Sequence, residues 1–398
     1  MKRNWVNLLH IYQPPWQTMD VLDRIINTSY SYILNSLEKE NRIKISLNVS
    51  GSLVEHLVRE KRFDLIERIR ALVNKGQIEL VATAMYHPLL PLIPIKEVIR
   101  QIKLNEEFNS RYFKEEWLMA GSRYGGRGFY LPEIAYSNEV AKVISDLGYA
   151  WITIDETAIV NKDQLDWNKS YVVKGTKLKL LIRNRRLHPI SKLSLHSGPE
   201  NYLVTVTDGE IYGDHPNENL WWSIRWNEVS PELMTAEDND FNSLTVGEYL
   251  NEISGPSQEL DLKSSNWEMT KAEEEKLSYF HMWHNPDDNL HSQLWTFLKE
   301  IITVLEEHKH DKNFPQVREY MDKALSSCTW WWVDGRYLGY NPTEISKGLT
   351  AMITTARSFD HIAVEHRIRF EKLYSEIIYE VWTRHWKAWE SKNIIKND

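Results

Sequence analysis

The chain has 398 residues, 42% of them hydrophobic, and its 48 basic and 56 acidic side chains give a net charge of −8. This length can bury a large core and exceeds the usual size of one domain, so we expect one large domain and a smaller one. The charge balance provides no broad basic surface and argues against nucleic acid as a partner. We interpret the short cluster of Arg183, Arg185 and Arg186 as a solvated loop face.

The N-terminal segment and the cysteine content bear on location. The single cysteine, Cys328, excludes an intrachain disulfide and fits a reducing compartment. The first apolar run is short and is interrupted by Asn7, His10 and Pro14, which argues against a signal peptide. No stretch approaches the roughly 20 apolar residues of a membrane-spanning helix. We therefore expect a cytoplasmic protein with no membrane partner.

In the first half of the chain, short apolar runs alternate with helical patterns. Helices are predicted over 21–37 and 52–74, the latter closed by Gly76, and a further one begins at 94–108. Seven strands are predicted, at residues 5–9, 43–49, 78–85, 129–131, 151–154, 178–182 and 202–207. Strands that alternate with helices predict a parallel sheet, and about seven such repeats approach barrel size.

After about residue 245 the pattern is helical and no strand is expected. Helices are predicted over 271–298, 298–308, 314–332, 343–358 and 362–389. The Ser-Gly-Pro-Ser segment at 254–257 is the natural boundary. We therefore predict an α/β domain over 1–253 and a C-terminal α-helical bundle domain over 254–398 that contributes aromatic residues to the cleft.

Polar and ionisable residues follow five of the predicted strands. They are His10 and Gln13 after the first strand, His87 after the third, Glu133 after the fourth, Asp155 and Glu156 after the fifth, and Asp208 and Glu210 after the seventh. In a parallel barrel these positions lie at one rim, where active sites are found. Acidic residues after strands also cap helices, but five such ends favour a site. For Asp155 and Glu156, hydroxyl binding and capping both remain open.

A carboxylate-rich rim suits two kinds of chemistry. One is cleavage of a glycosidic bond by a pair of carboxyl groups, and the other is a metal site built from Asp, Glu and His. Tyr12 stands where a second His would complete a His-x-His pair with His10. His281 and His284 could chelate from a predicted helix, but we interpret them as ordinary polar positions. The carboxylate pair is therefore favoured, and no metal or organic cofactor is expected.

Other candidate motifs are weaker. The glycine-rich segment 121–128 lacks the Gly-Lys-Ser/Thr of a phosphate-binding loop, and we interpret it as a turn that leads into the next strand. Ser137 and Cys328 lie in no recognisable nucleophile context and are interpreted as structural. Tryptophan is abundant, with 17 residues, and flat aromatic rings cover the apolar faces of sugars. Trp221, Trp222 and Trp330 are candidate stacking platforms, although most tryptophans must pack in the core.

Five segments together resemble the motifs of glycoside hydrolase family 57. Residues 10–14 are similar to His-x-His-Gln-Pro, residues 76–91 match the second motif at length, and residues 130–136 are similar to Trp-Leu-Pro-Glu-x-x-Tyr. Residues 208–213 and 327–332 are similar to the fourth motif and to an aromatic motif of the helical region. The departures are Tyr12 in place of His, Tyr130 in place of Trp, and Cys328 with Thr329 where many members have an acidic residue.

The resemblance implies a fold and a reaction. The fold would be an incomplete (β/α)7 barrel followed by a C-terminal α-helical domain. The reaction would be retaining hydrolysis of an α-linked glucan or oligosaccharide, with Glu133 as nucleophile and Asp208 as general acid/base. His10, Gln13, His87, Glu210, Trp221 and Trp330 would bind substrate.

Three alternatives remain open beside this reaction. One is a glucanotransferase or α-galactosidase of the same family. Another is a metal-dependent glycan hydrolase or deacetylase. The third is a glycan-binding protein without turnover. The sequence leaves the oligomeric state and the sugar undetermined.

Overall fold

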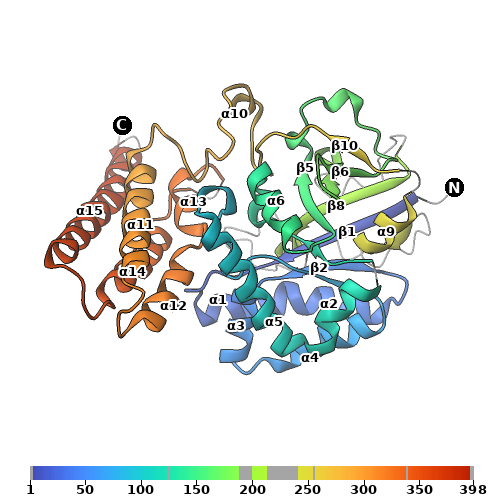
Figure 1. Cartoon of the computed structure of the whole chain (residues 1–398), viewed down its shortest axis with the longest axis horizontal. Helices are drawn as coiled ribbons and strands as arrows, with labels where there is room; N and C mark the ends of the chain where they lie inside the picture. The colour runs from blue at the N-terminus through green and yellow to red at the C-terminus, as the bar shows by residue number, and fades with distance from the viewer. Residues whose placement is uncertain are drawn as a thin grey trace. The chain divides into compact units, whose positions relative to one another are not determined.

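The computed structural model describes residues 3–123, 125–187, 200–212, 241–253, 256–337 and 339–394. The chain forms two compact units (Figure 1). The first comprises Met1–Gln13 and Gln17–Trp267, and the second comprises Pro14–Trp16 and Glu268–Asp398. The division falls after Trp267 instead of after residue 253, because a strand at 258–260 pairs within the first unit.

One sheet of the first unit is centred on β1. Its strands are β1 (Arg3–Ile11), β2 (Ile45–Val49), β3 (Ile78–Val81), β8 (Tyr202–Asp208) and β9 (Phe241–Leu244). The order is β3-β2-β1-β8, with β9 also paired to β1, and every pair is parallel. The α/β class predicted from the alternating pattern is confirmed.

The second sheet has the order β10-β6-β7-β5-β4. Its strands are β4 (Gly128–Phe129), β5 (Trp151–Asp155), β6 (Tyr171–Val173), β7 (Lys179–Arg183) and β10 (Gln258–Leu260). Only β6 and β7 pair antiparallel. A parallel bridge between Ala82 and Phe129 joins this sheet to the end of β3. All seven predicted strands are therefore confirmed, whereas the expectation of no strand after residue 245 is wrong, because β10 is too short and polar to show an apolar pattern.

The helices of the first unit cover the sheets, and α4 and α5 contact β3. They are α1 (Met19–Ile25), a π-helix (Ile26–Tyr30), α2 (Ser31–Lys39), α3 (Gly51–Arg59), α4 (Phe63–Asn74), α5 (Ile95–Arg123), α6 (Asn138–Asp146) and α9 (Val246–Glu252). The single helix predicted over 52–74 is interrupted at Lys61, where φ is 57°. The turn predicted over 121–128 is wrong at its start, because α5 continues to Arg123.

Short 3₁₀ turns follow several strands. They are η2 (Leu90–Leu92), η3 (Pro132–Ile134), η4 (Glu156–Ala158), η5 (Lys162–Gln164), η6 (Arg185–Leu187) and η8 (Gly209–Ile211). Three of them, η3, η4 and η8, place carboxylates directly after β4, β5 and β8 or their flanking residues. These turns therefore decide how the acidic side chains leave the sheets.

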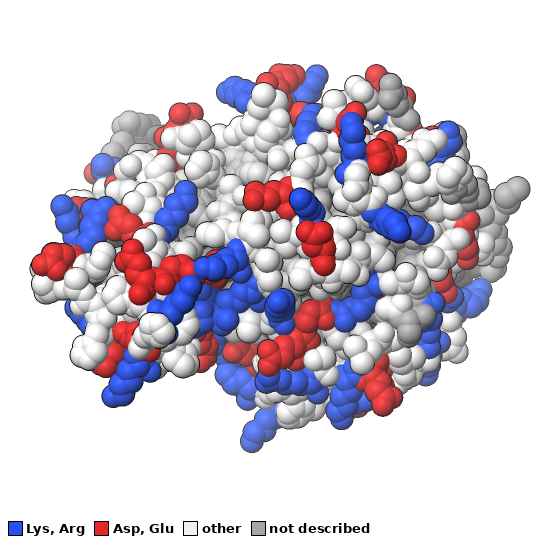
Figure 2. Space-filling model, viewed as in Figure 1, with Lys and Arg blue, Asp and Glu red and all other residues white. Residues whose placement is uncertain are grey.

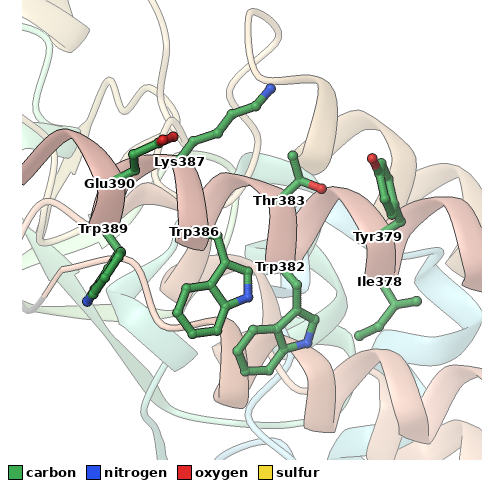
Figure 3. A pocket seen from close by; sticks show the side chains of 8 residues that line it. All are labelled: Ile378, Tyr379, Trp382, Thr383, Trp386, Lys387, Trp389 and Glu390. Atoms are coloured by element: carbon green, nitrogen blue, oxygen red, sulfur yellow. The ribbon is translucent and has the colours of Figure 1, made fainter.

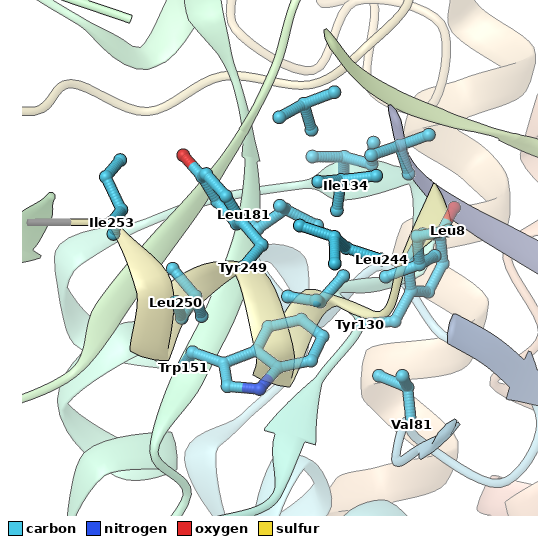
Figure 4. Packing of buried hydrophobic residues seen from close by; sticks show 14 residues of the cluster. Leu8, Val81, Tyr130, Ile134, Trp151, Leu181, Leu244, Tyr249, Leu250 and Ile253 are labelled. Carbon is cyan, nitrogen blue, oxygen red and sulfur yellow. The ribbon is translucent and has the colours of Figure 1, made fainter. Parts of the chain in front are cut away.

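The core of the first unit is built from strand residues that are buried on both sides of the chain. Leu8, Val81, Leu181 and Tyr130 pack together with Trp151, and Figure 4 shows Tyr249 and Leu250 of α9 beside them. Burial of one such side chain stabilises the fold by roughly 1.5–3 kcal/mol. This packing fixes the strands whose ends carry the ionisable residues.

The second unit is helical within its described residues. Its helices are α10 (Lys271–Glu275), α11 (Asn289–Glu307), α12 (Phe314–Ala324), α13 (Cys328–Asp334), α14 (Pro342–Arg357) and α15 (Val364–Ile394). The helix predicted over 271–298 is wrong in its middle, since Leu277 has φ of 57° and Pro286 disfavours helical geometry at Asn285. His281 and His284 therefore lie between helices.

The surface carries mixed charge, and an aromatic hollow lies on the second unit. On the face drawn in Figure 2, basic and acidic side chains are interspersed. A hollow of about 720 Å³ lies along α15, where Trp382 and Trp386 project to the same side (Figure 3) and Trp386 and Trp389 are more than half exposed. Within the residues described, no helix combines the length and the apolar character needed to cross a bilayer.

Gly128 is predicted to be irreplaceable for packing reasons. A Cβ at this position would lie 1.9 Å from Cε2 of Trp151, so Gly128→Ala should lower the free energy of unfolding by about 1–3 kcal/mol. Gly121→Ala is the matched control, because Gly121 lies in α5 and its nearest neighbour is the flexible side chain of Arg127, 3.1 Å away. Denaturant titration of both variants tests this, and equal stability of the two would contradict it.

Candidate active site

The register of β1 and β8 places the first site residues side by side. His10 of β1 is paired with Asp208 of β8 on one side and with Asn48 of β2 on the other. The Nδ1 atom of His10 lies 2.6 Å from Oδ1 of Asn48. Because these strands are parallel, the residues that follow them collect at one edge of the sheet.

Four aromatic rings stack at this edge. The His10 ring lies 4.4 Å from the Tyr130 ring and 4.8 Å from the His87 ring, and Tyr12 lies 4.4 Å from His87. Burial lowers the pKa of His10 to about 4, and burial together with the nearby His10 holds the pKa of His87 well below its usual value. Both imidazoles are therefore neutral near pH 7, and each ring has one donor and one acceptor nitrogen.

Glu133 faces this stack from the η3 turn. Its Oε1 lies 3.6 Å from Nδ1 of His87, and its Oε2 accepts a hydrogen bond of 2.9 Å from Nε1–H of Trp267. The backbone of Glu133 is in the left-handed region with φ of 58°, as is that of His87 with φ of 56°. Such strained residues concentrate at functional sites, where the surrounding structure enforces the conformation.

Asp208 precedes the η8 turn and Glu210 lies within it. The carboxylate of Glu210 accepts hydrogen bonds from the Tyr30 hydroxyl and from Nε2 of Gln13, the latter at 3.2 Å. Burial raises the pKa of Glu210 to about 7. A Cβ at Gly209 would lie 2.4 Å from Cγ2 of Ile11, so the turn needs glycine to lie against β1.

The charges of Asp208 and Glu133 both affect the pKa of the Tyr130 hydroxyl. Burial raises the pKa of Tyr130 well above its usual value, and the negative charges of Asp208 and Glu133 raise it further. The charge of Asp208 also contributes to the raised pKa of Tyr30. Asp208, Glu133 and Glu210 are therefore all within electrostatic reach of Tyr130. The sequence prediction that these strand ends form one site is consistent with this grouping.

Asp155 has a structural role, as a capping residue and as the partner of two arginines. It is fully buried, accepts a hydrogen bond from the backbone N–H of Thr157, and forms ion pairs with Arg183 at 2.9 Å and with Arg185 at 2.8 Å. The capping interpretation of Asp155 is confirmed. The interpretation of the arginine cluster as a solvated face is wrong for Arg183 and Arg185, because a buried carboxylate holds both. It is right for Arg186, whose side chain is 61% exposed.

The predicted sugar platforms are buried or lie outside the described residues. Trp330 is 1% exposed and stacks on Trp295 at 4.2 Å in the core of the helical unit, which contradicts its interpretation as a sugar platform. Trp221 and Trp222 lie outside the described residues. Within the described ranges, no three His, Cys, Asp or Glu side chains converge in a way that could hold a metal ion. Cys328, which stands in a family acidic position, is the first residue of α13.

Sequence reasoning missed Trp267, Tyr30 and Asn48. Trp267 follows no predicted strand, and it reaches Glu133 only through the tertiary fold. Tyr30 lies in a π-helix that the helical pattern does not distinguish from an α-helix. Asn48 gave a weaker signal, since it is one of two polar residues of β2, with Ser46, and both are fully buried.

The geometry defines an α/β protein with carboxylates gathered at the ends of parallel strands, a placement typical of enzymes of this class. The sequence model of Glycosyl hydrolase family 57 matches residues 9–328. The chain belongs to this family, and the family predicted from the motifs is confirmed.

Similar proteins support this membership. An α-amylase of Pyrococcus abyssi is 28% identical over 268 residues, which is 62% of this chain and 38% of that protein. A 4-α-glucanotransferase of Thermococcus litoralis is 26% identical over 271 residues, or 63% of this chain and 39% of that protein. The chain thus spans about two fifths of the length of these curated relatives. The crystal structure of a branching enzyme from Thermococcus kodakaraensis has a TM-score of 0.67 at 14% identity, covers 94% of both chains, and shows the fold alone.

Burial of Glu210 predicts a pH dependence of stability. Its pKa is raised from 4.5 to about 7 in the folded protein, so the folded state binds more protons than the unfolded state between these values. The contribution of Glu210 to stability should therefore fall as pH rises from about 4.5 to about 7 and level off above, by up to about 3 kcal/mol.

Glu210→Gln should remove this contribution, because the amide does not ionise. Glu67→Gln is the control, since the Glu67 side chain is 62% exposed. Urea titrations at pH 5 and pH 8 give the two differences. An unchanged pH dependence in Glu210→Gln would show that Glu210 ionises normally in the folded protein.

Proposed function

We propose that this protein is a retaining glycoside hydrolase that acts on α-linked glucans. The observation that carries the proposal is that Asp208 ends β8 beside His10, while Glu133, after β4, lies 3.6 Å from His87, whose ring stacks on that of His10, so both carboxylates follow parallel strands near the same stacked rings. Two carboxyl groups on opposite sides of a glycosidic bond are the minimum machinery for its cleavage. Neutral His10 and His87 beside them provide donors and acceptors suited to sugar hydroxyls.

We also propose a finer description of the fold. The strands β1, β2, β3, β4, β5, β7 and β8 follow one another around an incomplete (β/α)7 barrel, with the interruption between β7 and β8. Three observations support this description. The order of pairing runs in sequence, the Ala82–Phe129 bridge continues it from β3 to β4, and Nε of Arg183 donates to the carbonyl of Val206. The helical unit is then a C-terminal domain.

The mechanism assigns a role to each carboxyl group. Glu133 attacks the anomeric carbon while Asp208 donates its proton to the departing glycosidic oxygen, which leaves a covalent glycosyl-enzyme. Asp208 then removes a proton from water, and the water displaces Glu133 with a second inversion. Gln13 and Glu210 form one hydrogen-bonded group that supports this side of the site.

The names of the relatives favour α-glucan as the substrate class. The relatives described above are named α-amylase and 4-α-glucanotransferase. Hydrolysis and transfer share the same first step and differ in whether water or a sugar hydroxyl accepts the glycosyl group. Tyr12, which replaces a family histidine, stacks on His87 and so alters the ring surface that a sugar would meet.

Loss of either carboxyl group should abolish most activity. Glu133→Gln and Asp208→Asn should fold normally, because each preserves side-chain volume, and should lower kcat by at least about 100-fold on malto-oligosaccharides. Product release, measured beside Glu67→Gln as an exposed Glu-to-Gln control, tests this. Full activity in either variant would refute the role assigned to that residue.

The stereochemistry of the product tests the nucleophile separately. Double displacement gives a product with the α-configuration of the substrate, whereas direct attack by water gives the β-anomer. Proton NMR during the first minutes of hydrolysis distinguishes the two, and a β-product would refute Glu133 as nucleophile. Longer oligosaccharides among the products would identify a transferase.

A further inference from the structure

We infer that Trp267 is a positioning residue that fixes the carboxylate of Glu133 and keeps it ionised through the indole N–H. This inference rests on the proposed function, since it takes Glu133 to be the nucleophile. The two residues are far apart in sequence, yet Trp267 touches Glu133 twice. Its Nε1–H donates to Oε2 at 2.9 Å, and its backbone N–H donates to the Glu133 carbonyl at 3.3 Å.

The hydrogen bond from the indole favours the ionised form of Glu133. An indole N–H is a donor only, and it bonds more strongly to an ionised carboxylate than to a protonated carboxyl group, whose oxygens are weaker acceptors. A hydrogen bond to the charged form favours that form. A nucleophilic carboxylate must be ionised and aimed at the anomeric carbon, and the indole bond meets both requirements.

Trp267 is itself held by two arginines. Its carbonyl accepts a hydrogen bond of 2.7 Å from Nη2 of Arg185, and the guanidinium of Arg183 lies 5.6 Å from the centre of its ring. Both arginines are paired with Asp155, which is fully buried. The planar guanidinium of Arg185 thus bridges Asp155 and Trp267 with donors in fixed geometry.

This arrangement gives the left-handed backbone of Glu133 a physical support. The residue is held in a strained conformation with φ of 58°. The two bonds from Trp267 engage both its carbonyl and its side chain, and the buried ion pairs of Asp155 anchor Trp267. The chain of contacts therefore runs from the ends of β5 and β7 to the carboxylate that follows β4.

The test is Trp267→Phe, which keeps an aromatic ring and removes the N–H. With a malto-oligosaccharide that the wild type cleaves, kcat should fall about 10- to 100-fold while KM changes less than about twofold. The acidic limb of the pH profile should move to higher pH by about one unit. Arg185→Lys, which keeps the charge but not the planar fork, should shift both readouts less and in the same direction.

The matched control is Trp5→Phe. Trp5 is buried in the same unit and its Nε1–H also makes a hydrogen bond of 2.8 Å, but to the neutral hydroxyl of Thr205 on β8. This variant should lose stability without a change in the pH profile. If Trp267→Phe behaves like Trp5→Phe in both kcat and pH profile, the positioning role is overturned.

Failure of the proposed function would be recognised separately. Full activity of Glu133→Gln, or no turnover of any α-glucan by the wild type, would refute the nucleophile and leave the indole contact to be judged without turnover. Carbodiimide reacts with protonated carboxyl groups, so the pH midpoint of Glu133 labelling, read by mass spectrometry, reports its ionisation. A higher midpoint in Trp267→Phe than in wild type supports the contact, and an equal midpoint overturns it.

Discussion

The parallel pairing of β1 with β8 and β2 is the constraint on which the site depends. β1 pairs with β8 from Asn4 to His10 and with β2 from Leu8 to Ile11, so its carboxyl end is fixed on both sides. A slip of one residue in a parallel ladder would turn every side chain to the other face of the sheet. His10 would then leave the ring stack. The η8 turn, in which Gly209 packs closely against Ile11, would lose this contact with β1.

Burial around this ladder sets the electrostatics. The same low-polarity surroundings that make His10 and His87 neutral also raise the pKa of Glu210 and of the tyrosines near it. Isolated buried charges are costly, and the fold answers in two ways. Asp155 is compensated by two arginines, whereas Glu210 is compensated by neutral donors, Tyr30 and Gln13. Asp155, which is neutralised by arginines, therefore lies at the end of β5, whereas the titratable Glu210 lies in the η8 turn after β8.

The features of the fold that could be predicted from the sequence are those set by short runs of neighbouring residues. Apolar runs identified all seven strands from β1 to β8 other than β6, and residues directly after them, such as His10, Glu133 and Asp208, could be assigned to one edge because parallel strands impose it. The partnership of Asp155 with Arg183 and Arg185 could not be predicted, since about 30 residues separate them and nothing in a single arginine states its partner. Trp330 failed for a related reason: an abundant aromatic residue has the same local pattern in a core as on a platform.

Trp267 illustrates what remains beyond sequence patterns. It belongs to no strand, and its role arises only because the described chain brings the segment around residue 267 back to the turn after β4, where the backbone of Tyr136 also pairs with Ser265. A left-handed Glu133 is costly by itself, of order 1–3 kcal/mol, and persists only where neighbouring contacts over-determine it. The segment from Ser265 to Trp267 supplies those contacts, so the geometry of the carboxylate after β4 depends on a part of the chain more than a hundred residues away. This dependence explains why a match to the motif around Glu133 identifies the family but does not describe how the carboxylate is held.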